Sequence, residues 1–481
     1  MTEAALTQKL DVDVTIIGAG TAGMAAFRAA TKRGKHAILI EAGPYGTTCA
    51  RVGCMPSKLL IAAADAAHHA KESAPFGVHA DVRIDGKAVM DRVRRERDRF
   101  VGFVVESVES FPADKRIQGR AHLTGANDIV VEHADGTTTE VHTKTIVIAS
   151  GSSPVVPAMF DRIKDRLIIN DDVFTWEALP RAVAVFGAGV IGLELGQALH
   201  RLGVRVHVFG RGNTVGPLAD PAVKDAAMKI FRAELAVDFD AKILSVEPKD
   251  DGIEVRFEDE SGNARSETFG CALIAAGRRP NVGSLGLAKA GIHADTRVDR
   301  GTLQWGSSNV FIAGDATNDV PLLHEAADEG AIAGDNAARF PDVAPGKRRS
   351  GLGVAFTDPA LAVIGGGFPA ASQQPYVVGQ VDFGDQGRSR IMLQNRGLAR
   401  LYADPHTRRF LGGEMVGPRA EHLAHLLAWA HQSELTVDQM LAMPFYHPVI
   451  EEGLRTALRD LAAKLDDRAS ATDGATPGDY K

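Results

Sequence analysis

A glycine-rich segment occurs twice in the chain, each time directly after a short apolar run that is typical of a buried strand. An Ala/Leu-rich helical stretch and a second strand follow each copy. In this context, glycines let the backbone approach a pyrophosphate at the N-terminus of the helix. The repeat therefore predicts two βαβ units and two dinucleotide sites in one chain. The shared spacing GxGxxG is formed by Gly18, Gly20 and Gly23 and by Gly187, Gly189 and Gly192.

The two copies differ at the end of their second strand. The position 18 residues after the third glycine is Glu41 in the first copy and Gly210 in the second, where Arg211 follows. An acid at this position accepts hydrogen bonds from a ribose and disfavours a 2′-phosphate, whereas an arginine can pair with a phosphate. We therefore expect Glu41 to bind a ribose, and the choice between NAD and NADP in the second copy stays open.

Two of the three cysteines, Cys49 and Cys54, are separated by only four residues. On a regular helix they would lie ~7.5 Å apart along the axis on nearly opposite faces, whereas a disulfide needs Cα atoms within roughly 4.4–6.8 Å. A bond between them requires a break in the helix, which Gly53 permits. Pro56 suits the first turn of a following helix, whose N-terminus stabilises a thiolate together with Lys58. A reactive pair is indicated, with two buried structural thiols as the alternative.

The rest of the chain extends this α/β pattern and then departs from it. An apolar strand ends at Gly314-Asp315, where the acid could bind a sugar or ribitol hydroxyl. After residue 349 the βαβ pattern stops. We expect strands near 389–394 and 398–403 and helices near 420–431 and 437–442. The predicted fold class is α/β, with two Rossmann-like dinucleotide-binding domains and a C-terminal α+β dimerisation domain.

Composition excludes several classes of protein. The net charge of −7 and the pI near 6.2 argue against a nucleic-acid-binding surface. Three cysteines are too few for a secreted disulfide scaffold, and two without metal-spaced partners predict no metal site. No apolar run approaches the ~20 residues of a membrane span, and the N-terminus lacks a signal-peptide pattern. We expect a cytoplasmic protein that does not associate with membranes.

Taken together, these motifs strongly resemble the class I pyridine nucleotide–disulfide oxidoreductases, and within them the dihydrolipoamide dehydrogenases. The resemblance covers about residues 10–467. Its most specific parts are the Cys49–Lys58 segment, the doubled glycine motif, Gly314-Asp315, and His447-Pro448 with Glu452. The implied domains are 1–150 (FAD-binding, with the redox disulfide), 151–290 (NAD(P)-binding), 291–350 (completing the FAD site), 351–467 (dimerisation) and 468–481 (a disordered tail).

The resemblance also implies roles for individual residues. Cys54 corresponds to the sulfur next to the flavin of FAD, and Cys49 to the sulfur that exchanges with substrate. His447 corresponds to the general base, supplied across a dimer interface and oriented by Glu452. Lys58 and Glu194 correspond to an ion pair near the flavin. The implied FAD-binding positions are Gly18, Gly20, Gly23, Glu41, Lys58, Gly151, Gly314 and Asp315, and the implied nicotinamide-nucleotide positions are Gly187, Gly189, Val190, Gly192, Arg211 and Gly277.

The implied reaction is the oxidation of a dihydrolipoyl group by a Cys49–Cys54 disulfide, with electrons passing through FAD to NAD, or to NADP. The implied assembly is a homodimer that serves a lipoyl-bearing 2-oxo acid dehydrogenase or glycine cleavage complex. Phe445, Val449 and Glu451 depart from the family pattern around the base and leave the substrate open. Two alternatives remain.

One alternative is an NADPH-dependent, glutathione-reductase-like enzyme, which Arg211 favours, although Pro217 stands where a second arginine is expected. The other alternative is a redox-sensing or scaffold flavoprotein.

Overall fold

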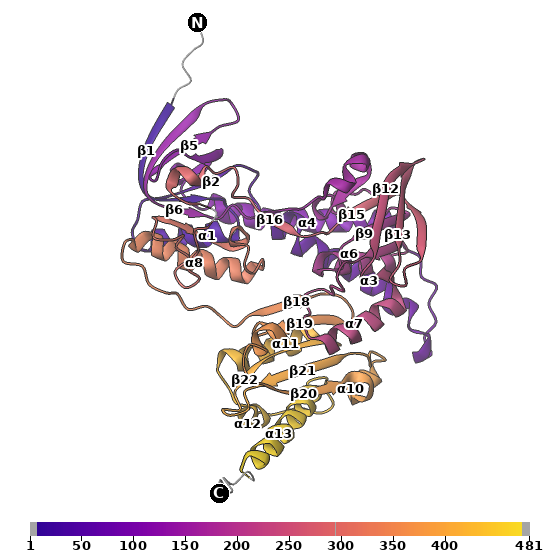
Figure 1. Cartoon of the computed structure of the whole chain (residues 1–481). Coiled ribbons are helices and arrows are strands. Elements are labelled where there is room, and N and C mark those ends of the chain that lie inside the picture. Colours follow the sequence, from indigo (N-terminus) through magenta and orange to yellow (C-terminus); the bar gives the residue numbers. More distant parts are fainter. Residues whose placement is uncertain (1–6, 294, 474–481) are drawn as a thin grey trace.

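The computed structural model describes residues 7–293 and 295–473, and its first sheet carries the first glycine motif (Figure 1). The strand order is β3-β2-β1-β6-β5-β4. Strand β17, which comes much later in the sequence, also pairs with β6. Strands β3, β2, β1, β6 and β17 run parallel, while β4 and β5 pair antiparallel beside them. The bounds are β1 (Thr7–Ile17), β2 (Ala37–Glu41), β3 (Arg116–Gln118), β4 (Arg120–Leu123), β5 (Asp128–Glu132), β6 (Thr138–Ile148) and β17 (Val310–Ile312).

Two helices, α1 (Thr21–Lys32) and α8 (Leu323–Arg339), pack against each other beside this sheet. Glycines allow their close approach, because a Cβ atom at Gly330 would lie 2.1 Å from the Ala22 carbonyl oxygen. Residues as far apart in sequence as Arg33 and Asp335, 302 positions, are thereby joined in one domain.

The second sheet carries the second glycine motif and has the order β11-β10-β9-β15-β8, with all neighbours parallel. An antiparallel sheet, β12-β13-β14, and a two-stranded ribbon, β7-β16, accompany it. The bounds are β7 (Ser152–Pro154), β8 (Leu167–Ile169), β9 (Ala182–Phe186), β10 (Arg205–Phe209), β11 (Ala236–Asp238), β12 (Lys242–Lys249), β13 (Gly252–Glu258), β14 (Ala264–Phe269), β15 (Cys271–Ile274), β16 (Arg278–Pro280), α6 (Val190–Arg201) and α7 (Pro221–Glu234).

The two cysteines lie on a pair of helices, α2 (Thr48–Val52) and α3 (Cys54–Lys71), that connects the two nucleotide domains. Helix α3 packs against α4 (Gly86–Glu109) of its own domain and against α6 of the second domain. The thiols therefore lie on an element that contacts both dinucleotide-binding units.

The C-terminal domain is an antiparallel sheet of order β18-β19-β22-β21-β20, which packs against α11 and α13 (Figure 1). The bounds are β18 (Leu352–Ala355), β19 (Ala360–Ile364), β20 (Val377–Asp382), β21 (Leu398–Ala403), β22 (Phe410–Gly417), α9 (Gly367–Ala371), α10 (Gly387–Ile391), α11 (Ala420–Gln432), α12 (Val437–Leu441) and α13 (Glu452–Asp473).

Two expectations for this domain are wrong. The segment near 389–394, expected as a strand, begins inside α10, because the Gln386 side chain caps that helix by accepting from the Ser389 amide at 2.7 Å. The disordered tail is expected from residue 468, but α13 continues to Asp473. Residues 474–481 lie outside the described part of the chain.

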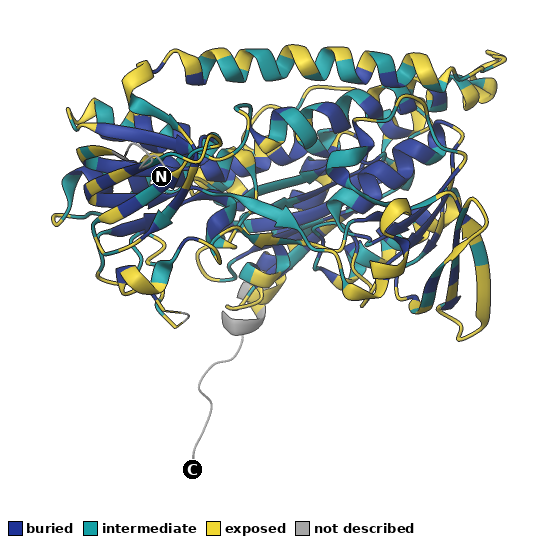
Figure 2. Ribbon diagram, turned by 90° about the horizontal axis from the view of Figure 1, so that it is seen from above, coloured by how far each residue is buried: buried dark blue, intermediate teal, exposed yellow. Residues whose placement is uncertain are grey.

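Burial follows the layers: the strands of the three main sheets are largely buried, and the outer helix faces and loop tips are exposed (Figure 2). Within the described residues, no helix has both the length and the apolar character needed to cross a bilayer. Short helical segments complete the chain at Ala74–Phe76, Ala113–Lys115, Ala158–Arg166, Asn170–Val173, Leu287–Ala290, Gly314–Thr317 and Phe383–Asp385.

Candidate active site

The two glycine turns have the same backbone geometry. Gly18 and Gly187 have φ values of 111° and 120°, and a Cβ atom would lie 2.2 Å and 2.3 Å from a neighbouring carbonyl oxygen. A Cβ atom on the third glycine of each motif, Gly23 or Gly192, would lie 1.8 Å from the carbonyl oxygen of the first. Only glycine fits these four positions, so the structure confirms the predicted duplication of the turn.

The middle glycines leave space at the start of each following helix. Gly20 precedes α1 and Gly189 precedes α6, and an added Cβ atom would have no neighbour within 4 Å at either position. The helix N-termini are thus accessible to a pyrophosphate, whose charge the amide groups and the helix dipole favour.

Glu41 is held beside the first glycine turn. Its Oε2 atom accepts from the Ala19 amide at 2.7 Å and its Oε1 atom from the Gly43 amide at 2.8 Å. This carboxylate is fixed at the end of β2, where an acid can receive a ribose hydroxyl.

Asp315 is held by Ser152, which Arg278 holds in turn; the sequence did not single out either side chain. The Ser152 hydroxyl donates to Asp315 Oδ2 at 2.7 Å, and the Arg278 Nε donates to the Ser152 oxygen at 2.8 Å. Both directly follow a predicted site residue, Gly151 or Gly277, which is the one signal that could have identified them.

Two buried polar atoms lack a hydrogen-bond partner among the described residues. They are the hydroxyl of Ser150, a residue whose backbone lies beside Gly18, and the Nε2 atom of His324, in the first turn of α8. Buried polar groups are normally paired. Unpaired atoms, an open helix N-terminus and two fixed carboxylates together fit the predicted FAD.

As the sequence indicates, the end of β10 in the second βαβ unit differs from the end of β2 in the first. A Cβ atom at Gly210 would lie 2.7 Å from the Phe239 carbonyl oxygen, so the backbone leaves no room there for an acidic side chain. Arg211 follows with its side chain exposed. The nearby Asp240 accepts from the Gly212 amide at 2.7 Å.

The helix carrying the thiols is interrupted between them, as predicted. Helix α2 ends at Val52, Gly53 has φ −126° and ψ −118°, and α3 begins at Cys54. A Cβ atom at Gly53 would lie 3.0 Å from the Thr48 carbonyl oxygen. Both thiols are free in this structure and are hydrogen-bonded to each other.

Of the two thiols, Cys54 loses its proton much more readily than Cys49. The hydrogen bond from Cys49 lowers the pKa of Cys54 to about 7, and the charge of Lys58 acts in the same direction. The same hydrogen bond and burial raise the pKa of Cys49 far above its ordinary value. The reduced pair is therefore poised as one thiol and one thiolate near neutral pH.

We expect the reduced, FAD-free protein to form one thiolate per chain as the pH rises through about 7. A second thiolate should not form near this pH, because a charge on Cys49 would face that of Cys54 and burial raises the pKa of the Cys271 thiol to about 11. The ultraviolet absorbance of thiolates, measured against pH, checks this. Two thiolates that form together near the ordinary thiol pKa would contradict it.

An ion pair joins the thiol helix to the second nucleotide domain. Lys58 Nζ lies 2.7 Å from Glu194 Oε2, and the Glu194 side chain is only 5% exposed. The amide of Phe356, in the C-terminal domain, donates to Glu194 Oε1 at 2.8 Å, and its ring lies 4.5 Å from Lys58 Nζ. The structure thus brings together the predicted pair and adds Phe356, for which the sequence analysis proposed no role.

The predicted base lies elsewhere in the monomer. His447 Nδ1 is 3.0 Å from Glu452 Oε2, and the His447 side chain is 79% exposed. The other oxygen of Glu452 accepts from Arg455 at 2.7 Å. Although desolvation opposes it, hydrogen bonds from the Val449 amide and His447 lower the pKa of Glu452.

Helices α12 and α13, which flank His447, lie at the lower end of the molecule in Figure 1, far from α3. Within one chain, the thiols and the His447–Glu452 pair therefore lie in two separate places.

Comparisons with known proteins cover nearly the whole chain. Residues 12–330 match the family described as pyridine nucleotide-disulphide oxidoreductase, and residues 352–458 match its dimerisation domain. The chain is 30% identical over 459 residues to a dihydrolipoyl dehydrogenase of Haloferax volcanii, covering 92% of this chain and 95% of the relative. It is 29% identical over 458 residues to that of Halobacterium salinarum, with the same coverage.

Among solved structures, LpdA of Mycobacterium tuberculosis is similar, with a TM-score of 0.77 and 25% identity; the match covers 94% of this chain and 99% of that one.

Proposed function

The chain belongs to the pyridine nucleotide-disulphide oxidoreductase family, and from this premise we propose that it oxidises dihydrolipoyl groups and reduces NAD. It is an FAD-dependent disulfide oxidoreductase of the dihydrolipoyl dehydrogenase type. The observation that carries the proposal is the Cys49/Cys54 pair at a helix break, joined through the 2.7 Å Lys58–Glu194 contact to the helix of the second glycine motif.

The residues of this chain account for the thiol chemistry. The partner's His447 takes a proton from one substrate thiol, and the resulting thiolate attacks the Cys49 sulfur of the Cys49–Cys54 disulfide. The disulfide bond breaks, and Cys54 leaves as a thiolate that Lys58 stabilises. The second substrate thiol then displaces Cys49 from the mixed disulfide, leaving an oxidised substrate and a reduced pair. FAD supplies the transfer of two electrons from the pair to the nicotinamide.

The assembly is part of this proposal. The C-terminal domain is of the family's dimerisation type, and we propose that a homodimer brings each exposed His447 to the thiols of the other chain. We further propose that the dimer serves a lipoyl-bearing 2-oxo acid dehydrogenase or glycine cleavage complex in the cytoplasm, where a reducing environment maintains catalytic dithiols.

A second candidate is an NADPH-dependent disulfide reductase, which the blocked position 210 and the exposed Arg211 favour. Steady-state rates with dihydrolipoamide and NAD, compared with glutathione disulfide and NADPH, separate the two. The proposal requires dihydrolipoamide to be the better substrate. Negligible turnover of both would favour a redox-sensing or scaffold flavoprotein and contradict the enzyme proposal.

The coenzyme preference gives a separate prediction. We expect NAD to be the working coenzyme, with NADP accepted far better than in relatives that carry an acid at the end of this strand. Arg211→Ala should lower kcat/KM for NADPH about ten- to hundredfold, because a charge-assisted bond to the 2′-phosphate is worth roughly 1.5–3 kcal/mol. The value for NADH should change little.

The matched control is Arg181→Ala. Arg181 is exposed and directly precedes β9, at the opposite end of the strand from the nucleotide turn. A wild-type preference for NADH above about a thousandfold that Arg211→Ala leaves unchanged would show that Arg211 does not contact the phosphate.

A further inference from the structure

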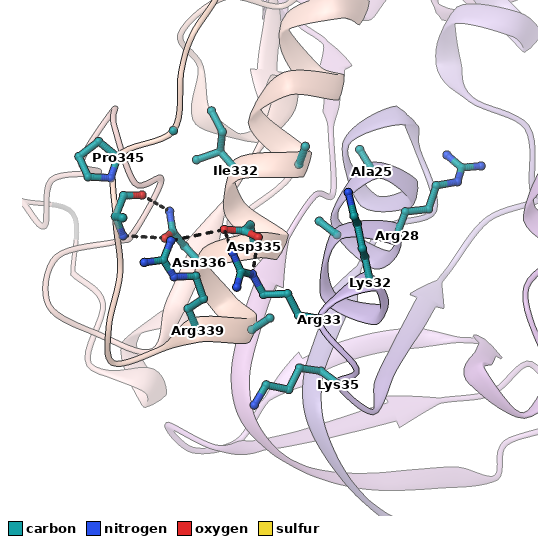
Figure 3. Close-up of a pocket in the computed structure, with 15 residues that line it drawn as sticks. Ala25, Arg28, Lys32, Arg33, Lys35, Ile332, Asp335, Asn336, Arg339 and Pro345 are labelled. Atoms are coloured by element: carbon teal, nitrogen blue, oxygen red, sulfur yellow. Dashed lines mark hydrogen bonds and ion pairs between the residues drawn. The ribbon is translucent and has the colours of Figure 1, made fainter.

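Two of the ion pairs between distant segments differ sharply in burial. Arg33, directly after α1, pairs with Asp335 of α8 at the outer surface of the first domain, where the two side chains are 43% and 39% exposed (Figure 3). Arg400 of β21 pairs with Asp220, directly before α7, at 2.7 Å, and the Asp220 side chain is fully buried. Exposed ion pairs contribute little to stability, whereas breaking a buried pair is costly. The Arg400–Asp220 pair therefore fixes how the C-terminal domain meets the second dinucleotide-binding domain.

The carboxylate of Asp220 is bonded through both of its oxygens. Its Oδ1 atom accepts from the Ala222 amide at 2.9 Å and from Arg400 at 2.7 Å. Its Oδ2 atom accepts from Arg400 at 2.9 Å and from the Tyr402 hydroxyl at 2.7 Å. Burial and this hydrogen bond raise the pKa of Tyr402 far above its ordinary value, so the phenol stays a donor. Asp220 thus caps α7 and binds two side chains of β21, and α7 packs against β21 and β22 (Figure 1).

A second buried carboxylate, that of Glu414 in β22, holds the same segment. Its Oε2 atom accepts from the amides of Ala219 and Asp220, both at 2.8 Å, and its Oε1 atom accepts from the Phe368 amide at 2.8 Å. The Glu414 side chain is fully buried. A buried charge needs such hydrogen bonds, and bonds to a charged acceptor are stronger than neutral ones. Two of the three donors belong to the second dinucleotide-binding domain, so this acid links the two domains.

The segment that these acids hold belongs to the candidate coenzyme site. It is the loop 210–220, which runs from the end of β10 to the start of α7 and contains Arg211. Within it, the Gly216 amide donates to the carbonyl of Ala188, in the second glycine turn, at 2.8 Å. A Cβ atom at Gly216 would lie 2.6 Å from Cδ1 of Leu361, in β19 of the C-terminal domain. The loop therefore lies between the glycine turn and the C-terminal domain.

We propose that Glu414 is a positioning residue for the coenzyme, which holds the loop 210–220 in the conformation that binds the nicotinamide nucleotide. Because its side chain is fully buried, Glu414 acts through the loop and does not contact the nucleotide. The inference rests on the proposed function, in which this loop carries Arg211 to the coenzyme. A loop that occupies its binding conformation for only a fraction of the time lowers the apparent affinity by that fraction. Loss of the Glu414 contacts should therefore weaken coenzyme binding and leave the thiol chemistry unchanged.

Isothermal titration of the oxidised, FAD-loaded protein with NAD tests the proposal, because no electron donor is present and only binding is measured. Glu414→Ala removes all three accepting contacts and should weaken NAD binding about tenfold or more, as for a loop that is correctly placed about a tenth of the time. Glu414→Gln keeps one carbonyl oxygen that can accept from the loop amides. Its affinity for NAD should be at least about twofold below that of the wild type and above that of Glu414→Ala.

The matched control is Asp404→Ala. Asp404 is an acid of the same domain whose Oδ1 atom accepts from two backbone amides, those of His406 and Thr407, within its own turn. Its loss should leave NAD binding at the wild-type value. Hydrogen exchange locates the effect: amides of the loop 210–220 should exchange faster in Glu414→Ala, while the rest of the second domain keeps its protection.

Anaerobic reduction of the flavin by dihydrolipoamide, measured without NAD, reports the thiol chemistry separately and should proceed at the wild-type rate in the Glu414 variants. Failure of this reaction in the wild type, with NAD binding intact, would contradict the proposed function and leave the role of Glu414 standing. Wild-type NAD affinity in either Glu414 variant, an equal loss in Asp404→Ala, or no NAD binding by the wild type would overturn the role given to Glu414.

Discussion

A Cys49→Ser chain is expected to retain FAD and to lose at least about a thousandfold of its dihydrolipoamide turnover, because no other group can form the mixed disulfide. In the proposed site Cys54 remains next to the flavin. It should still form a thiolate, because a serine hydroxyl can donate the hydrogen bond that Cys49 gives and Lys58 is unchanged. The oxidised variant should therefore show the long-wavelength absorption of a flavin beside a thiolate. Visible spectra and steady-state rates with dihydrolipoamide measure the two effects.

The chain offers a matched control for this substitution. Cys271 lies on β15, and burial raises the pKa of its thiol to about 11. Cys271→Ser makes the same chemical change away from the site and should leave turnover near the wild-type value. Near-normal dihydrolipoamide oxidation in Cys49→Ser would refute the role given to Cys49.

His447→Ala should lower turnover by about 10²–10⁴-fold, which is the usual contribution of a positioned base. Because the proposed base and the thiols lie in separate parts of one chain, the defect should be complementable. A heterodimer of Cys49→Ser and His447→Ala chains contains one intact site, formed by Cys49 of one chain and His447 of the other. Co-expression with two different tags, followed by tandem purification and rate measurement, tests this.

The two variant homodimers serve as controls and should both be inactive. The heterodimer should recover about half of the wild-type rate, because one of its two sites is intact. A heterodimer as inactive as its parents would place the base in the same chain as the thiols, or assign it to another residue.

The sequence by itself determined the features that depend on local backbone geometry. The positive φ angles of Gly18 and Gly187 and the interruption at Gly53 are properties of short segments. The carbonyl groups that a side chain at Gly18 or Gly187 would meet, at Ala149 and Ala275, directly follow strands that are distant in sequence and belong to the tertiary structure. Glu41 lies at the end of β2, and this position places its carboxylate beside the first glycine turn. These positions could be predicted because few residue types satisfy such constraints.

Only the tertiary structure decided which distant residues meet. Lys58 and Glu194 are 136 positions apart, and their 2.7 Å contact depends on the packing of α3 against α6. The family resemblance implied this pair, whereas Ser152 and Arg278, which hold Asp315, had no comparable signal. Packing of one domain on another sets such contacts, and local periodicity does not report it.

The same reason explains the remaining differences. Gly210 excludes an acid because the backbone of Phe239, directly after β11, lies against it. Residues near Ser389 form a helix because Gln386 caps it, although their apolar run also suits a strand. His447 is separated from Cys49 because its domain folds around its own core. Each outcome is set by neighbours that are distant in sequence or by competition between two local structures of similar propensity.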